Sequence, residues 1–295
     1  MISSFPDLLV ILRPKQWIKS LFVMAPLCFA GEAMNASKAY PALAAALLFC
    51  VGASAVYIFN DIVDRESDRF HVEKRQRPIA AGRVKPGVAL ALASLLCLVG
   101  LGGSLLLSWR LFLIVAIYIG VNVFYSLKLK HMAILDVLCI SAGFLLRVLA
   151  GGTVADVYIS NWLLVCTLSL SLFLSLGKRR QELALGEEEA ASGGRSLDSY
   201  SLSFLDQAIP TAATITIITY LLYVADQHTA QFFGTRAVLV TVIFVIYGVF
   251  RYFNLVLTHK RGGDPASLLL SDRPLFFCCL GWALTWLVII YGGRL

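Results

Sequence analysis

Long apolar segments, each close to the length of a membrane-crossing helix, recur from one end of this chain to the other. A helix that crosses a bilayer needs about 20 mostly apolar residues. Charged residues separate nine such segments: 16–33, 42–62, 88–107, 111–127, 132–152, 159–177, 209–226, 235–257 and 274–292. The sequence therefore predicts an all-α integral membrane protein, a bundle of nine transmembrane helices in one polytopic domain over residues 1–295.

The composition excludes the two main alternatives to a membrane protein. Hydrophobic residues make up 59% of the 295 residues and charged residues only 15%, whereas soluble domains carry about 25% charged residues. So few charges could not cover a water-soluble globule of this size. The high hydrophobicity also excludes intrinsic disorder.

Lysine and arginine are distributed unevenly between the two ends of the predicted spans. With a cytoplasmic N-terminus, all but a few of the 25 basic residues lie on the cytoplasmic side. The positive-inside rule therefore predicts a protein of the plasma (inner) membrane whose N-terminus is cytoplasmic. The cytoplasmic loops are expected near 63–87, 128–131, 178–208 and 258–273. This cationic face accounts for the net charge of +7 and suits anionic lipid or phosphorylated substrates, so no nucleic-acid partner is expected.

The most informative motif, NDIVDRESDR at 60–69, ends the second predicted span. If the helix continues, Asn60, Asp64 and Asp68 share one face, and Asp61 lies seven residues before Asp68. Carboxylates stacked in this way repel one another, so a cation is expected to hold them together. Oxygen ligands of this kind favour Mg²⁺, which commonly bridges to phosphate oxygens.

A solvated helix end, with its carboxylates paired to Arg65 and Arg69, is the structural alternative for this motif. We favour a functional site because ionised groups at a membrane edge are costly and usually functional. A basic segment follows at once, and Lys74 and Arg77 are close enough in sequence to fold back over the acidic face. There they could contact the phosphates that Mg²⁺ would hold.

With these motifs the chain resembles the UbiA-type intramembrane prenyltransferase superfamily, over nearly its whole length. The resemblance rests on the nine predicted spans, NDIVDRESDR at 60–69, RPIAAG at 77–82 and YSLKLK at 125–130. In that family the first motif binds the diphosphate of a polyprenyl substrate through Mg²⁺. The resemblance therefore implies a UbiA-like fold, an Mg²⁺ cofactor held by Asn60 and Asp64, and Asp61 and Asp68 as further ligands or supporting groups. It also implies that the three carboxylates Asp61, Asp64 and Asp68 are catalytic.

The sequence departs from the usual family pattern after the sixth span. Typical members carry a second aspartate-rich motif there, whereas this chain has KRRQEL at 178–183. Cations in place of carboxylates imply a substrate with additional negative charge; a stop-transfer cluster is the alternative. The departure resembles the decaprenyl-phosphate phosphoribosyltransferase branch, and so do four further segments: RPKQWIK at 13–19, KLKH at 128–131, GFLLR at 143–147 and GDP at 263–265.

The branch resemblance implies an activity and a role for each of several residues. Enzymes of this branch transfer a 5-phosphoribosyl group from phosphoribosyl diphosphate to a polyprenyl (decaprenyl-type) phosphate and release diphosphate. The residues implied for the donor are Lys15, Tyr57, Lys74, Arg77, Lys128, Lys178 and Arg179. Those implied for the lipid phosphate are Lys19, Lys130 and Arg147. Because Arg147 lies inside a span, an ion pair with Asp136 is an equally good explanation of that residue.

Two other functions account for parts of the sequence. A prenyltransferase that moves a polyprenyl group from its diphosphate to an aromatic acceptor would use the acidic motif but leaves KRRQEL unexplained. A transporter is disfavoured because the ionisable groups gather at one membrane edge and no internal repeat is visible. The sequence leaves open whether the chain forms a homo-oligomer.

Overall fold

The structure is a computed structural model that describes residues 5–70, 74–190, 200–258 and 265–292. Within these ranges the regular structure is entirely helical, without a β-strand. The chain divides into two compact units, residues 1–159 and residues 160–295. Because two compact units can be parts of one domain, the single polytopic domain stays a prediction.

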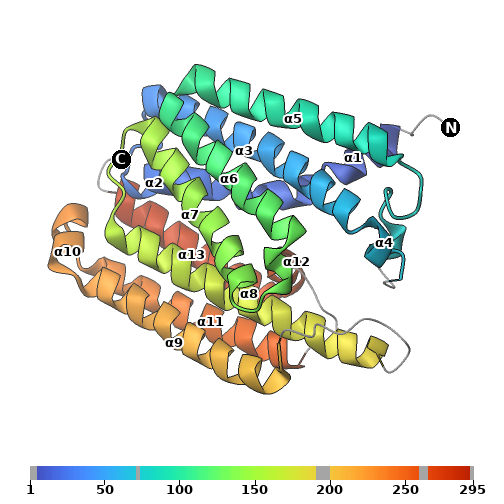
Figure 1. Cartoon of the computed structure of the whole chain (residues 1–295). Coiled ribbons are helices and arrows are strands. Elements are labelled where there is room, and N and C mark those ends of the chain that lie inside the picture. The colour runs from blue at the N-terminus through green and yellow to red at the C-terminus, as the bar shows by residue number, and fades with distance from the viewer. Residues whose placement is uncertain (1–4, 71–73, 191–199, 259–264, 293–295) are drawn as a thin grey trace. The chain divides into compact units, whose positions relative to one another are not determined.

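The first unit is organised around one long helix, α3 (Ala36–Val63), which packs against α5, α6, α7 and the 3-10 helix η1. Figure 1 shows α3 alongside α5 and α6. Small residues allow this close packing: a Cβ atom added to Gly100 of α5 would lie 3.6 Å from the backbone nitrogen of Gly52. The elements of this unit are α1 (Phe5–Ile11), η1 (Pro14–Met24), α2 (Ala25–Phe29), α3, α4 (Arg65–Asp68), η2 (Lys74–Gln76), α5 (Pro86–Leu107), α6 (Trp109–Leu127), η3 (Leu129–His131) and α7 (Leu135–Ala155).

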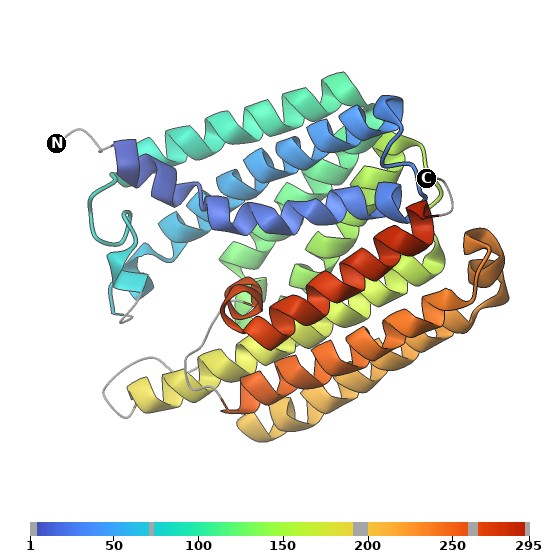
Figure 2. The ribbon, with the colours of Figure 1, turned by 180° about the vertical axis from the view of Figure 1, so that it is seen from behind.

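The second unit is built on α8 (Asn161–Ala190), which packs against α9 and α11, while α13 packs against α11. These helices run side by side in Figures 1 and 2. The remaining bounds are α9 (Leu202–Ala225), α10 (Gln227–Phe233), η4 (Ala237–Val240), α11 (Thr241–Thr258), α12 (Pro265–Ser271) and α13 (Arg273–Tyr291).

Among the described residues, eight helices are long and apolar enough to cross a membrane, and they match eight of the nine predicted spans. The all-helical membrane fold is therefore confirmed, whereas the count of nine is approximate. The first predicted span, 16–33, is formed by η1 and the short α2 instead of one long helix. Pro26 lies at the start of α2 and cannot donate a backbone hydrogen bond, which favours a break there. Figure 2 shows η1 running along α3.

All four predicted loops contain some helix, and two of them differ most from expectation. α8 continues to Ala190, so the loop predicted at 178–208 begins much later than expected. The residues after Lys178 include Glu, Leu and Ala, which are good helix formers. In addition, Lys178 Nζ lies 3.8 Å from Glu182 Oε1, one helical turn later. The loop predicted at 258–273 contains α12. Residues 263 and 264 of the GDP segment lie outside the described residues.

Candidate functional site

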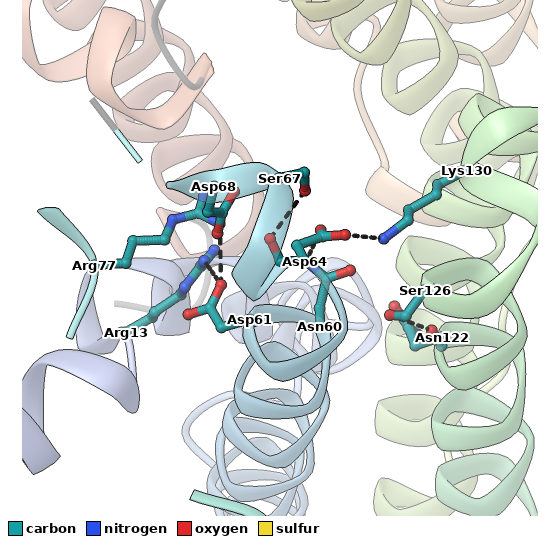
Figure 3. A network of polar contacts seen from close by, with 10 residues as sticks. All are labelled: Arg13, Asn60, Asp61, Asp64, Ser67, Asp68, Arg77, Asn122, Ser126 and Lys130. Carbon is teal, nitrogen blue, oxygen red and sulfur yellow. Dashed lines mark hydrogen bonds and ion pairs between the residues drawn. The ribbon is translucent and has the colours of Figure 1, made fainter. Parts of the chain in front are cut away.

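The acidic motif lies where α3 ends and the chain turns. Asp64 is the C-cap residue of α3, its backbone N–H donates to Asn60 O at 2.9 Å, and α4 begins with the next residue. The Ser67 hydroxyl donates to Asp64 O at 2.9 Å and supports the turn. Because the helix does not continue as one piece, the expected single face is wrong: Asp68 does not stack on Asn60 and Asp64. The four motif residues fall into two clusters on opposite sides of the end of α3 (Figure 3).

The first group, which we call the arginine cluster, consists of Asp61, Asp68, Arg13 and Arg77. Arg77 Nη1 donates to Asp61 Oδ1 at 3.0 Å and to Asp68 Oδ2 at 2.7 Å. Arg13 Nη2 also pairs with Asp61 Oδ1. The side chains of Asp61 and Asp68 are only 3% and 6% exposed. Two guanidinium groups therefore balance two buried carboxylates, a role that the sequence motif had suggested for a metal.

Arg13 is a site residue that the sequence motifs did not single out. It lies between α1 and η1 in the left-handed conformation, with φ 53° and ψ 57°, which costs a non-glycine residue about 1–2 kcal/mol. Its guanidinium lies 5.4 Å from the centre of the Tyr57 ring as well as against Asp61. The sequence showed Arg13 within the RPKQWIK segment, but it did not show that Arg13 pairs with Asp61, which lies 48 positions away in the chain. Tyr57, expected at the donor, thus borders the arginine cluster.

A buried serine of α3 holds the backbone on both sides of Arg13. The Ser54 hydroxyl donates to Leu12 O at 2.8 Å and accepts from Trp17 Nε1 at 3.0 Å. Leu12 precedes Arg13 directly, and Trp17 follows it by four residues. One side chain of α3 therefore helps to place Arg13 at Asp61, two helical turns further along the same helix.

The second group, which we call the lysine cluster, consists of Asn60, Asp64 and Lys130. Asn60 Nδ2 donates to Asp64 Oδ2 at 3.0 Å, and Lys130 Nζ pairs with Asp64 Oδ1. Lys130 lies on η3, between α6 and α7, and reaches Asp64 from the side opposite to the arginines (Figure 3). Asn60 Oδ1 is buried and has no hydrogen-bond partner within the described part of the chain. The alternative pairing of the motif's aspartates with Arg65 and Arg69 is absent among the described residues: Arg65 pairs with Glu66, and Arg69 Nε donates to Ala80 O.

The donor atoms of the lysine cluster fit a magnesium ion that is bound together with a substrate. The described residues contain no group of three or more His, Cys, Asp or Glu side chains arranged to hold a metal. Mg²⁺, however, usually takes only one or two protein carboxylates and completes its shell with water and substrate phosphates. Asn60 Oδ1 and the Asp64 carboxylate supply such oxygens, and a buried carbonyl oxygen without a partner costs free energy until it finds one. One oxygen of each arginine-cluster carboxylate, Asp61 Oδ1 and Asp68 Oδ2, is already engaged by arginine.

The remaining cations predicted for the first unit lie on η1, η2 and the end of α6. Lys15 and Lys128 are exposed, and Lys19 and Lys74 are half-buried. Lys128 is the C-cap residue of α6, next to the η3 helix that carries Lys130. Their roles toward a donor or a lipid phosphate stay predictions.

Arg147 of α7 lies inside the first unit, with its residue only 4% exposed. Its Nη1 donates to Gly143 O at 2.8 Å and its Nη2 to the Tyr118 hydroxyl at 2.9 Å. The guanidinium carbon lies 4.8, 5.7 and 5.6 Å from the ring centres of Tyr118, Phe49 and Phe144. Among the described residues no carboxylate is within ion-pair distance of it, so the expected pair with Asp136 is wrong. Enclosure by aromatic rings favours a packing role, and contact with a lipid phosphate stays a prediction.

The basic segment of α8 belongs to the second unit. Arg179 and Lys178 both pair with Glu182. Arg180 differs from both, because its Nε lies 2.6 Å from Asp206 Oδ1 and its Nη1 donates to Val256 O. It therefore connects α8 with α9 and α11. Binding of the donor by Lys178 and Arg179 stays a prediction.

Comparison with known proteins gives one consistent result. The family model described as UbiA prenyltransferase matches residues 21–281. Decaprenyl-phosphate phosphoribosyltransferases of Mycolicibacterium smegmatis and Corynebacterium glutamicum are 38% and 36% identical over 92% and 95% of this chain, and the matches cover 88% and 85% of those proteins. A UbiA homologue from Archaeoglobus fulgidus, solved with GPP and Mg²⁺, has the same fold, with a TM-score of 0.69 at 16% identity over 96% of this chain and 99% of that one.

Proposed function

Because the chain belongs to the UbiA prenyltransferase family and is an integral membrane transferase, we propose that it transfers a 5-phosphoribosyl group from phosphoribosyl diphosphate to a polyprenyl phosphate of the decaprenyl type. Diphosphate is the second product. The observation that carries this proposal is the identity, over nearly the whole chain, to relatives that bear the name of that enzyme. The charge arrangement at the end of α3 is consistent with the same chemistry.

The lysine cluster is the proposed place for Mg²⁺, held by Asn60 Oδ1 and the Asp64 carboxylate. The Archaeoglobus homologue was solved with a prenyl diphosphate, GPP, and Mg²⁺, so divalent metal use is known for this fold. When bound, Mg²⁺ would neutralise charge on the departing diphosphate and so assist its release. Asn60 and Asp64 need only supply two oxygens, because the phosphates of the donor supply others.

The cations around the cluster are proposed to bind the remaining charge of the donor. Phosphoribosyl diphosphate carries a 5-phosphate in addition to its diphosphate, so it needs more positive charge than a prenyl diphosphate. In the first unit, Lys15, Lys74, Arg77 and Lys128 are the proposed contacts, with Tyr57 beside them. Lys178 and Arg179, the cations of the KRRQEL segment, are proposed for the same donor.

The acceptor needs little help from the protein. A polyprenyl phosphate is already anionic at neutral pH, so its own oxygen can attack the sugar carbon without a strong general base. Departure of diphosphate leaves cationic character on that carbon, which nearby carboxylates stabilise. Lys19 and Lys130 are proposed to hold the lipid phosphate while its chain stays in the bilayer. We place this site on the cytoplasmic side of the plasma membrane, where the basic loops are expected.

Product analysis tests the proposal directly. Purified protein in lipid nanodiscs is incubated with Mg²⁺, labelled phosphoribosyl diphosphate and decaprenyl phosphate, and the lipid fraction is examined by mass spectrometry. We expect a phosphoribosylated lipid and an equal amount of diphosphate. Failure to form that lipid, together with prenylation of an aromatic acid from a polyprenyl diphosphate, would overturn the proposal.

A further inference from the structure

Lys130 forms an ion pair with the Asp64 carboxylate, which is the group proposed to bind the metal. Its Nζ pairs with Asp64 Oδ1, while Asn60 Nδ2 holds the other oxygen of the same group. The side chains of Lys130 and Asp64 are 13% and 24% exposed, so the pair is largely but not fully shielded from solvent. A divalent ion that approached Asn60 Oδ1 and Asp64 would meet this ammonium group first.

We propose that Lys130 is a placeholder cation: it neutralises Asp64 until metal binds, and then moves to a phosphate of the substrate. This inference rests on the proposed function, because it takes Asn60 and Asp64 as the metal ligands. The placeholder role goes beyond the proposed function, because it sets the order in which metal and substrate bind. Lys130 is then a positioning residue, since it acts on the metal through Asp64.

The chemistry of lysine suits an exchangeable partner. Its ammonium group is a compact point charge on a flexible four-carbon stem, whereas arginine holds carboxylates through a rigid fork. Asp64 has one cationic partner in the described structure, carried by the short η3 connection between α6 and α7. Asp61, in contrast, is held by two guanidiniums from two separate segments. Of the two carboxylates, Asp64 is therefore the one whose partner can leave with the smaller loss.

Charge balance links the departure of Lys130 to the arrival of the donor. If Lys130 left alone, Asp64 would keep an uncompensated charge in a largely shielded position, which is costly. A metal bound to diphosphate supplies a new cation for Asp64, and the freed ammonium of Lys130 can then hold the phosphate of the lipid acceptor. Metal and donor should therefore each increase the affinity for the other, by the same factor. Removing the charge of Lys130 should reduce this coupling.

Direct measurement of metal affinity tests the inference without relying on turnover. Mn²⁺ serves as the probe, and its free concentration is followed by electron paramagnetic resonance in the full-length protein in nanodiscs. The variants are Lys130→Gln and, should that variant fold poorly, Lys130→Met. Lys130→Arg retains the charge, and Lys128→Gln removes a cation two residues away, so these two serve as matched controls. Gel filtration checks the folding of each variant.

We expect Lys130→Gln to bind Mn²⁺ about tenfold more tightly than wild type in the absence of donor, which corresponds to about 1.4 kcal/mol. Both control variants should stay within about twofold of wild type. With donor present, Lys130→Gln should turn over more slowly, because the freed ammonium is missing. Replacement of a purely structural residue would not strengthen Mn²⁺ binding and at the same time slow turnover.

Each other outcome has a defined meaning. Unchanged or weaker Mn²⁺ binding by Lys130→Gln overturns the placeholder role, and so does an equal gain in Lys128→Gln, which would indicate a general charge effect. If Mn²⁺ binding does not depend on Asp64, as tested with Asp64→Asn, the metal site of the proposed function fails and the placeholder fails with it. If Mn²⁺ binds as expected but no phosphoribosylated lipid forms, the placeholder stands and the proposed substrates are wrong.

Discussion

The arginine cluster and the lysine cluster come from the same ten-residue motif but are built in different ways. Asp61 and Asp68 are nearly fully buried, and Arg77 bridges them while Arg13 adds a second contact to Asp61. Asp64 is more exposed and has a lysine partner, beside the Asn60 amide oxygen, which has no partner among the residues that the structure describes. We therefore propose that the carboxylates enclosed by arginines serve the fold, whereas Asp64, held by a single lysine, is the one that binds a ligand. The comparison teaches that an acidic motif need not act as one unit.

The largest expected effect is on the available carboxylate. Asp64→Ala should lower turnover by at least about 10²–10³-fold, the usual loss when a group that stabilises transition-state charge is removed, while the protein stays folded and inserted. Initial rates with labelled donor measure this effect. Glu66→Ala is the matched control, because the Glu66 side chain in the same motif is 76% exposed. Near-normal activity of Asp64→Ala would contradict the assignment of the lysine cluster to the metal.

The next largest effect separates the two clusters by stability. Arg77→Met leaves Asp68 buried without its arginine and should lower the free energy of unfolding by about 1–3 kcal/mol. Lys130→Met should lower it by less than Arg77→Met does, because the Asp64 side chain is 24% exposed and stays partly solvated. Thermal unfolding in detergent measures both. Arg83→Met is the control. Arg83 pairs with Asp7, and the Arg83 side chain is 48% exposed, so its loss should matter little. Equal destabilisation by the Arg77 and Lys130 variants would remove the distinction between the clusters.

A smaller effect is expected in the second unit. Lys178→Ala and Arg179→Ala should each raise the KM for phosphoribosyl diphosphate several-fold with little change in kcat, because a binding contact is lost. Arg180→Ala provides the comparison: its contacts with Asp206 and Val256 predict lower stability without a change in KM. If the KM is unchanged in the Lys178 and Arg179 variants, these residues serve only to set topology.

The smallest effect concerns the hydroxyl that places the arginine cluster. Ser54→Ala removes the bonds to Leu12 and Trp17 and should lower the free energy of unfolding by about 1 kcal/mol. Ser104→Ala is the control, because that hydroxyl donates to Gly100 O within its own helix. Chemical denaturation followed by tryptophan fluorescence compares them. A smaller loss for Ser54 than for Ser104 would show that α3 does not hold the turn at Arg13.

The sequence was sufficient for the helical membrane fold and for the position of the acidic motif, because both depend on local patterns. Span length identified eight of the long helices, and the motif lay at the end of α3 as predicted. Pairings between distant segments were not accessible. Nothing local indicates that Arg13 reaches Asp61, or that Lys130 reaches Asp64, over separations of 48 and 66 residues.

Two further differences have causes that the sequence patterns did not reveal. The turn at Asp64 was missed because helical spacing was extended through a motif with no glycine or proline to stop it. Arg147 was expected to need an anion or a carboxylate, but aromatic rings from α3, α6 and α7 can also stabilise a guanidinium. Aromatic residues are common in membrane spans, so their sequence positions alone did not indicate this enclosure.

The opposing charges at the end of α3 have a consequence for how the protein is made. Since arginine and lysine side chains already balance the carboxylates of this motif, the newly synthesised chain can enter the bilayer and complete its folding without waiting for a divalent ion. If the proposed function holds, biogenesis in a cell short of magnesium would yield a folded enzyme that lacks only its metal ion and its sugar donor.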